Sequence, residues 1–196
     1  MGDVSQGLST TTYALLGLLA LDGDASSSLT GYELKQRADR TLRFYWVSPA
    51  MSQVYTELDR LTRLGFVEAT EERSGRRTSQ HYRLTAEGLA ELHSWLIDAD
   101  ADFPVLKHPV ALRLLMGGLV DRERMAQHLQ RYLDQLQERS RELAGVRTWL
   151  GDAEALQYPA MVAEWGLDYY ASETEIVTRL ADRLATLPPP GGSAAG

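Results

Sequence analysis

The stretch "SPAMSQVYTELDRLTRLGF", residues 48–66, predicts a single helix whose beginning and end are both marked. Ser48 is a favourable N-cap, and Pro49 suits the first helical position because no N–H is needed there. Gly65 ends the helix, since glycine readily takes the left-handed conformation found at helix C-termini. The apolar residues recur at helical spacing, so we expect them to form one buried stripe. They are Met51, Val54, Leu58 and Leu61.

The opposite face of this helix is polar but poor in carboxylates. It presents Ser52, Gln53, Thr56, Arg60 and Arg63, with Tyr55 at its edge. Such side chains hydrogen-bond to base edges and phosphates, whereas carboxylates are repelled by phosphate. Glu57 and Asp59 lie off the centre of this face or compromise it, and Asp59 counts against contact with DNA. The alternative is an ordinary solvated face, on which the arginines pair with carboxylates and Tyr55 is a packing residue.

The residues on either side extend this helix into a domain over 10–98. Helices are predicted over 10–21 and 31–42, the second capped by Thr30. After Gly65, "FVEATEE" (66–72) and "SQHYRLT" (79–85) are rich in β-branched and aromatic residues and predict a hairpin. Its turn contains Gly75, and Thr85 caps a further helix over 86–98. Arginines surround the tip of the hairpin; they are Arg73, Arg76 and Arg77.

The order of three helices followed by a hairpin is that of a winged helix-turn-helix. In that fold the third helix enters the major groove of DNA, and the hairpin, or wing, lies along the backbone. The arginines at the hairpin tip fit a wing that contacts phosphate or reaches into the minor groove. We therefore expect the helix over 48–66 to be a recognition helix that contacts double-stranded DNA.

Charge is unevenly distributed along the chain. The net charge of −7 over 196 residues would by itself disfavour nucleic acid. Residues 30–85, however, hold ten Lys and Arg against seven Asp and Glu, whereas residues 1–29 carry −3 and residues 86–196 carry −7. A basic island in an acidic chain favours local contact with phosphate, while the remainder resists indiscriminate binding.

The C-terminal part predicts a second, entirely helical domain over 109–187, after a linker over 99–108. A short apolar helix opens it, Asp121 caps a long helix over 122–150, and a last helix runs from about Ala160 to Leu187. The long helix has leucines seven residues apart, interrupted by Arg139, which is typical of a coiled-coil-like seam. These are Leu129, Leu136, Leu143 and Leu150.

Two helices of this length cannot bury their apolar stripes alone. They must pack against each other, against the N-terminal domain or against a second copy of the chain. A symmetric dimer would present two recognition helices to two half-sites of a DNA duplex. The predicted fold class is therefore mainly α, with an N-terminal winged helix-turn-helix and a C-terminal helical, coiled-coil-like dimerisation domain.

Several other classes of protein are disfavoured by composition. The chain has no cysteine, so disulfides and thiolate chemistry are excluded and a reducing cytoplasm is expected. No stretch approaches the ~18 consecutive apolar residues of a transmembrane helix. The four histidines lack metal-ligand spacing, and there is neither a Gly-rich phosphate loop nor a nucleophile elbow, so no enzyme, metal or cofactor is expected. Residues 1–9 are expected to be flexible and residues 188–196 disordered.

Four segments together resemble PadR-type transcriptional regulators. They are "YALLGLLAL", "LTGYELKQ", "FYWVSPAMSQVYTELDRLTRLGFVEA" and "HYRLTAEGLAELHSWL", which lie within residues 12–97. The remaining length is similar to the longer branch of that family, whose C-terminal helical domain mediates dimerisation. Arg outnumbers Lys by eighteen to two, which is consistent with a GC-rich bacterial source.

The resemblance implies a cytoplasmic homodimeric repressor that binds a palindromic operator and is released by a small molecule or another signal. By position, it implies DNA contacts from Ser52, Gln53, Tyr55 and Thr56, and phosphate contacts from Tyr32, Lys35, Arg76 and Arg77. Family members sense phenolic acids or planar drugs through aromatic-lined spaces. Candidate residues for such a space are Trp46, Trp95, Trp165, Tyr169 and Tyr170, although an aromatic residue on an apolar stripe can equally be core.

A different class of function stays open on the sequence alone. A winged helix can dock a partner protein instead of DNA, so the chain could be a protein-interaction adaptor without specific DNA binding. The basic island disfavours this alternative, because docking to a protein does not require arginines in the wing.

Overall fold

The computed structural model describes residues 8–21, 27–74, 77–101, 103–104 and 106–187. The chain divides into two compact units, Met1–Phe103 and Pro104–Gly196, which are described separately. The expected flexible N-terminus falls largely, and the expected disordered tail entirely, outside the described residues.

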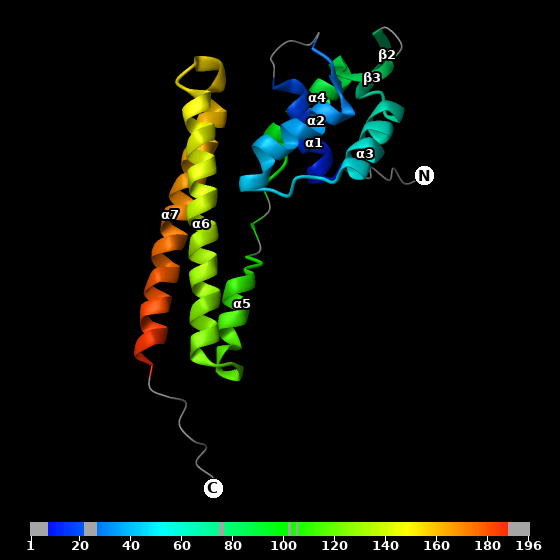
Figure 1. Ribbon diagram of the computed structural model, residues 1–196. Helices are drawn as coiled ribbons and strands as arrows, with labels where there is room; N and C mark the ends of the chain where they lie inside the picture. Colours follow the sequence, from blue (N-terminus) through cyan, green and yellow to red (C-terminus); the bar gives the residue numbers. More distant parts are fainter. Residues whose placement is uncertain (1–7, 22–26, 75–76, 102, 105, 188–196) are drawn as a thin grey trace. The chain divides into compact units, whose positions relative to one another are not determined.

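The first unit has the order of elements that the sequence predicts. The helices α1 (Thr10–Ala20), α2 (Gly31–Thr41) and α3 (Met51–Arg63) precede the hairpin of β2 (Val67–Ser74) and β3 (Arg77–Leu84). Helix α4 (Ala86–Asp98) follows the hairpin (Figure 1). This is a winged helix-turn-helix, in which α2 and α3 form the helix-turn-helix and the hairpin forms the wing.

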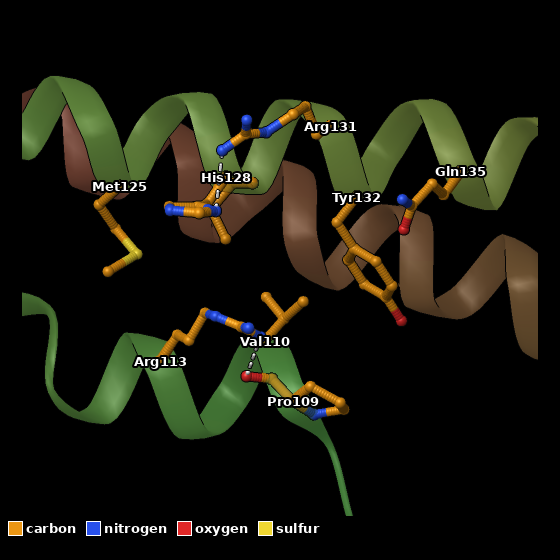
Figure 2. Close-up of a pocket in the computed structure, with 9 residues that line it drawn as sticks. Pro109, Val110, Arg113, Met125, His128, Arg131, Tyr132 and Gln135 are labelled. Carbon is orange, nitrogen blue, oxygen red and sulfur yellow. Dashed lines mark hydrogen bonds between the residues drawn. The ribbon is translucent and has the colours of Figure 1, made fainter.

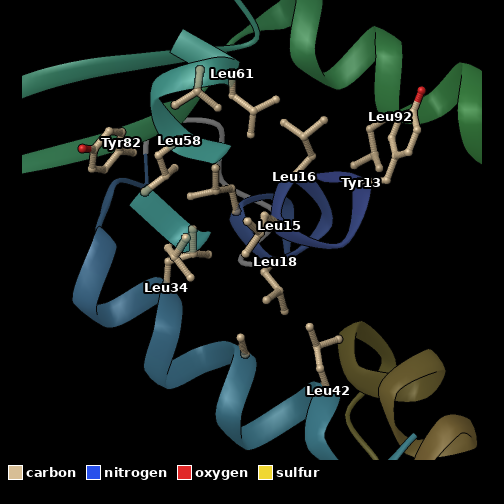
Figure 3. Close-up of a cluster of buried hydrophobic side chains, with 14 residues drawn as sticks. Tyr13, Leu15, Leu16, Leu18, Leu34, Leu42, Leu58, Leu61, Tyr82 and Leu92 are labelled. Carbon is tan, nitrogen blue, oxygen red and sulfur yellow. The ribbon is translucent and has the colours of Figure 1, made fainter. Parts of the chain in front are cut away.

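The core of this unit is built on α1, which presents apolar side chains around much of its circumference. Leu15 and Leu16 are fully buried, and Leu18 and Leu19 nearly so. Helix α3 adds three residues of its predicted stripe, Val54, Leu58 and Leu61, each 0% exposed, whereas the fourth, Met51, is only half-buried. Figure 3 shows Leu58 and Leu61 in this core. The recognition helix is therefore anchored along one side, which leaves its polar side exposed.

The start of α3 differs from the sequence-based expectation. The helix begins at Met51 with Ala50 as its N-cap, so the prediction of Ser48 as the cap was wrong. The hydroxyl of Ser48 instead donates to Asp39 Oδ1 of α2 (2.7 Å), and the side-chain oxygen of Gln53 accepts the Ala50 N–H (2.8 Å). At the other end, Gly65 has a φ of +77°, as predicted for the residue that terminates the helix.

The sheet has a third strand that the sequence analysis missed. The two-residue strand β1 (Leu29–Thr30) pairs antiparallel with β3, with Leu29 opposite Tyr82 and Thr30 opposite His81. The strand order is β1-β3-β2, so β3 is central. Two residues are too few to show an alternating pattern, which is why no periodicity marked this strand.

Thr30 also caps α2, as predicted. Its hydroxyl accepts the Glu33 N–H (3.2 Å), and Glu33 Oε2 accepts the Thr30 N–H (2.8 Å), which completes a capping box. The hydrogen bonds from the backbone and hydroxyl of Thr30 lower the pKa of the Glu33 carboxyl from its ordinary value of 4.5.

This capping box gives a prediction about stability. We expect Thr30→Ala to lower the free energy of unfolding by about 1 kcal/mol, because it removes the N-cap hydroxyl.

The Glu33 side of the capping box makes stability depend on pH. Because the pKa of Glu33 is lower in the folded state, the contribution of its carboxylate to the free energy of unfolding is present above its ordinary pKa and is lost as the pH falls through the folded value. Urea unfolding at neutral pH and near pH 3 should show a smaller acid-induced loss for Glu33→Gln than for the wild type, and equal losses would contradict the assignment.

The second unit is a helical hairpin with a short additional helix. Helix α6 (Arg122–Leu150) and helix α7 (Gln157–Thr186) lie side by side, and α5 (Pro109–Leu115) packs against α6 (Figure 1). Short 3-10 helices, η2 (Gly117–Leu119) and η3 (Glu154–Leu156), precede α6 and α7. Another 3-10 helix, η1 (Leu42–Phe44), follows α2 in the first unit.

The predicted seam of α6 is confirmed as a buried stripe. Its leucines at positions 129, 136, 143 and 150 are at most 8% exposed. Arg139, which interrupts the pattern, is exposed and pairs with Glu142 (3.0 Å). The seam packs against α7 of the same chain, where Ala163, Gly166 and Val177 are buried. Over the described residues, no helix is long and apolar enough to cross a membrane.

Candidate DNA-binding surface

The exposed surface of α3 begins with its first two turns. Ser52, Gln53 and Thr56 are exposed there, as predicted. The Thr56 hydroxyl donates to the Ser52 carbonyl (2.9 Å), and Gln53 uses its side-chain oxygen on the Ala50 N–H. The amide nitrogen of Gln53 and the hydroxyl of Ser52 can therefore meet acceptors or donors in a groove. The N-terminal part of a recognition helix is where base edges are contacted in helix-turn-helix proteins.

The two acidic residues of α3 have different surroundings. Glu57 Oε2 accepts a hydrogen bond from Thr12 of α1 (2.7 Å) and lies 3.9 Å from a guanidinium nitrogen of Arg60. Thr12 is fully buried, so this hydrogen bond fixes the Glu57 carboxylate toward α1. Asp59 is exposed on the same surface as Thr56 and counts against base contact at that position. Arg60 is half-buried beside Glu57, whereas Arg63 is exposed.

Tyr55 partly has a packing role. Its side chain is 43% exposed, but the ring lies directly against the start of α2. A Cβ on Gly31 would come within 2.6 Å of Tyr55 Cε1. The glycine therefore allows α2 and α3 to approach closely through this ring, while the remaining edge of Tyr55 is exposed.

The two candidate phosphate contacts on α2 differ in how far their polar groups are already engaged with neighbouring side chains. Tyr32 is 57% exposed, and its hydroxyl accepts a hydrogen bond from Gln36 (2.9 Å). Lys35 is half-buried and forms an ion pair with Asp39, and its Nζ also donates to Ser48 Oγ at 3.5 Å. The hydrogen bonds from Lys35 and Ser48 lower the pKa of the Asp39 carboxyl. Lys35 thus links α2 to the loop before α3.

The wing is described except at its tip. Arg73 is exposed, but Arg76 and the side chain of Arg77 lie outside the described residues. Nearer the base of the wing, Arg83 pairs with Glu68 across the two strands. His81 lies 3.0 Å from Ser79 Oγ and 3.7 Å from a Glu72 oxygen.

One part of this surface was missed by the sequence analysis. A polar hollow of about 280 Å³ is lined by residues of α3 and by Ser9 and Thr11 at the start of α1. The residues from α3 are Ser52, Gln53, Thr56 and Glu57. Helix α1 was predicted correctly, but nothing local in "STTT" indicates which hydroxyls come to lie beside α3. The polar surface therefore extends beyond the recognition helix.

The aromatic residues considered for an effector space are distributed over both units. Trp95 is stacked on Tyr13 at 4.6 Å between ring centroids, and the Tyr13 hydroxyl donates to Glu91 (2.7 Å). Burial and this hydrogen bond raise the pKa of Tyr13 to about 12. Trp46 is exposed in the loop before α3. On α7, Trp165 stacks with Tyr169 at 6.0 Å, and Tyr170 is buried beside them.

A cavity lined by other residues lies between α5 and α6 (Figure 2). Its volume is about 290 Å³. The aromatic residue in its lining is Tyr132, and none of the five aromatic candidates contributes to it. Over the described part of the chain, no cluster of three or more histidines and carboxylates could hold a metal ion.

Comparison with known proteins matches both units to described families. Residues 18–94 match the transcriptional regulator PadR-like family, and residues 106–185 match the virulence activator alpha C-terminal family. The chain is 30% identical over 136 residues to the negative transcriptional regulator PadR of Bacillus subtilis, covering 69% of this chain and 70% of that protein.

Solved structures share the whole fold. B. subtilis PadR in complex with operator DNA matches 90% of this chain and 99% of its own, with a TM-score of 0.78 and 23% identity. The same protein in complex with p-coumaric acid matches 89% and 98%, with a TM-score of 0.70 and 23% identity. The winged helix-turn-helix, the helical C-terminal unit and the sequence match together show that the chain belongs to the PadR-like family of transcriptional regulators.

Proposed function

We propose that this protein is a homodimeric repressor that binds a palindromic operator through α3 and the wing and is released by a small-molecule effector. The single observation that supports it most is the exposed N-terminal half of α3, where Ser52, Gln53 and Thr56 are presented and the nearby Glu57 carboxylate is held by Thr12, which leaves Asp59 as the exposed carboxylate of this surface. The apolar stripe behind them fixes the helix on the core, so these side chains are presented on a rigid element. The relative crystallised with operator DNA supports the same use of the fold.

The proposal is tested by binding to duplex DNA from upstream of the protein's own gene. Fluorescence anisotropy at low salt should give saturable binding, and a DNase I footprint should show a site with twofold symmetry. The salt concentration at which the protein elutes from a heparin column gives an independent measure of how strongly the basic residues of 30–85 bind a polyanion. If neither heparin nor any duplex retains the protein at low ionic strength, the adaptor alternative replaces this proposal.

The wing supplies the second prediction. We expect Arg76→Ala combined with Arg77→Ala to weaken operator binding by roughly tenfold and to flatten its salt dependence, because each phosphate contact adds about 0.9 to the slope of log K against log salt. Arg83→Ala is the matched control, since Arg83 is already paired with Glu68. A slope that is unchanged in the double variant would remove the wing tip from the DNA contacts.

Dimerisation is proposed from a second apolar face on α7. The residues that pack on α6 lie on one side of the helix, whereas another set recurs at spacings of three and four on an adjacent side and is exposed. Tyr158 is 73% exposed, Met161 60% and Trp165 59%. Tyr169 and Ile176 continue the same stripe. Contiguous exposed apolar surface of this kind is typical of an interface between subunits.

The third prediction follows from that face. We expect Trp165→Glu to lower the affinity of the dimer by at least about tenfold, because a buried unpaired carboxylate is costly in an apolar interface. Sedimentation velocity over a dilution series measures the change. Ala171→Glu is the control, since Ala171 is exposed and lies away from the apolar stripe. If both variants remain dimeric at every concentration, this face is not the interface.

Release by an effector is proposed from the relative that binds p-coumaric acid. An effector lowers operator affinity only if it binds better to a conformation that fits DNA less well. In a dimer, a small change in the angle between subunits is sufficient, since both half-sites must be reached at a spacing of ~34–36 Å.

A further inference from the structure

A chain of hydrogen bonds runs from the first turn of α1 to the middle of α3. Ser9 Oγ lies 2.7 Å from Thr12 Oγ1, and Thr12 Oγ1 donates to Glu57 Oε2 at 2.7 Å. An ionised carboxylate only accepts hydrogen bonds, so the single hydroxyl proton of Thr12 is given to Glu57, and Ser9 donates to Thr12. The two hydroxyl groups therefore point the same way along the chain, an arrangement in which each hydrogen bond strengthens the next.

The surroundings of Thr12 make this hydrogen bond difficult to replace. Thr12 is 0% exposed, and the side chain of Glu57 is 20% exposed. Because Thr12 is shielded from solvent, water cannot take the place of Glu57 as the acceptor of its proton. The Thr12 hydroxyl has no part in capping α1, since the Thr12 backbone N–H is what donates to the N-cap Ser9 (3.2 Å).

Glu57 also lines the polar hollow of about 280 Å³ between the start of α1 and α3. The residues of α3 that share this lining are Ser52, Gln53 and Thr56, the same side chains that are proposed to meet the operator. The hollow gives a released carboxylate room to turn toward that surface, where it would be repelled by phosphate. The position of the Glu57 carboxylate therefore sets the charge that α3 presents.

Arg60 shares the carboxylate oxygen that Thr12 holds. A guanidinium nitrogen of Arg60 lies 3.9 Å from Glu57 Oε2, which is longer than a hydrogen bond. Thr12 rather than Arg60 is thus the hydrogen-bonding partner of this oxygen, and the N–H groups of Arg60 can donate to a phosphate. Without the Thr12 hydroxyl, the carboxylate could close on Arg60 and cancel its charge.

We propose that Thr12 is a positioning residue for DNA binding, whose buried hydroxyl holds the Glu57 carboxylate away from the operator and keeps Arg60 available to phosphate. Thr12 cannot touch DNA itself, because it is fully buried. The inference rests on the proposed function, namely binding to DNA through α3. It adds to that function a residue of α1 that controls affinity through a charge on another helix.

Thr12→Val tests the role of the hydroxyl, because it removes this group and keeps the branched shape of the side chain. We expect operator affinity, measured by fluorescence anisotropy at low salt, to fall about tenfold through like-charge repulsion by Glu57. Such repulsion is screened by salt, so the loss should shrink between about 50 mM and about 200 mM salt. Thr12→Ser keeps the hydroxyl and should bind within about twofold of the wild type.

A double-mutant cycle with Glu57→Gln separates charge from structure. Glutamine at position 57 carries no charge, so Thr12→Val in this background should change operator affinity by less than about twofold. A purely structural role of Thr12 would give the same loss in both backgrounds. Glu57→Asp provides a second route if Thr12→Val does not fold, because it keeps the charge on a side chain too short to reach Thr12, and it should reproduce the salt-dependent loss.

Tyr13→Phe is the matched control. The Tyr13 hydroxyl also donates from α1 to a carboxylate, that of Glu91 on α4, at 2.7 Å. Tyr13→Phe releases a carboxylate in the same unit but not on α3, so operator affinity should stay within about twofold of the wild type. Thermal unfolding of each variant by circular dichroism shows that affinity is compared between folded proteins.

Two results would overturn the role of Thr12: equal losses of affinity for Thr12→Val with Glu57 and with Gln at position 57, or wild-type affinity for both Thr12→Val and Glu57→Asp. Binding of the wild type to duplex DNA is measured first. If the wild type binds no duplex, the proposed function fails and this inference fails with it. If the wild type binds operator and the two substitutions are uncoupled, the role of Thr12 alone is lost.

Discussion

Thr56→Glu is expected to weaken operator binding by at least about a hundredfold, more than the double substitution in the wing. A carboxylate placed in the groove beside phosphates and base acceptors costs several kcal/mol through like-charge juxtaposition, and a hundredfold loss corresponds to about 2.7 kcal/mol. Folding should be preserved, because Thr56 is exposed and glutamate is a good helix former. Fluorescence anisotropy at fixed salt measures the affinity, and circular dichroism checks the helix content.

Ala90→Glu provides the matched control for this experiment. Ala90 is exposed on α4 of the same unit, so the substitution changes net charge equally without touching α3. We expect it to alter affinity by less than about threefold through long-range electrostatics alone. If the two variants bind operator equally well, the exposed N-terminal half of α3 does not enter the groove.

The second large effect concerns the stability of the winged helix itself. A Cβ on Gly88 would lie 2.1 Å from the carbonyl oxygen of Phe66, which accepts the Thr85 N–H at 3.1 Å. The atom that the added methyl group would meet belongs to the backbone, and it is held by the hydrogen bond from Thr85. It therefore cannot rotate away as a side chain could. We expect Gly88→Ala to lower the free energy of unfolding by about 3 kcal/mol or more. Thermal unfolding followed by circular dichroism measures it.

Gly17→Ala is the control for Gly88→Ala. Gly17 lies inside α1, and a Cβ there would have no neighbour within 4 Å. Alanine is favoured over glycine in a helix interior by about 1 kcal/mol, so this variant should be slightly more stable than the wild type. Equal melting temperatures for the two alanine variants would contradict the close approach of α4 to Phe66.

Much of the winged helix could be predicted from sequence because its signals are local. Thr30 and Thr85 mark helix starts by their own hydroxyls, and Val54, Leu58 and Leu61 reveal the buried side of α3 by spacing alone. The same local reasoning was wrong at Ser48, whose hydroxyl is taken by Asp39 nine positions earlier. An N-cap contributes about 1 kcal/mol and a hydrogen bond to a carboxylate at least as much, so a distant partner can compete with the cap, and the sequence does not reveal that partner.

The candidate site was less predictable, because its properties depend on residues far apart in the chain. Glu57 was expected only to lie off the centre of the DNA face or to compromise it, and its hydrogen bond to Thr12, 45 positions away, is visible only in the fold. Lys35 was expected to face phosphate, yet its ammonium group is paired with Asp39. The cavity lined by Arg113 and Arg131 could not be found from spacing, since those residues meet only through the packing of α5 on α6.

The double role of Thr30 has a mechanical consequence for the whole winged helix-turn-helix. It is at once the last residue of β1, paired with His81 in the central strand, and the N-cap of α2. The hairpin and the pair of helices α2 and α3 are thus joined through one residue, so a displacement of the wing is transmitted directly to α2. Disrupting this connection would let the hairpin and α2 move independently. Faster amide hydrogen exchange at β1 would then be detected before any helix unfolds.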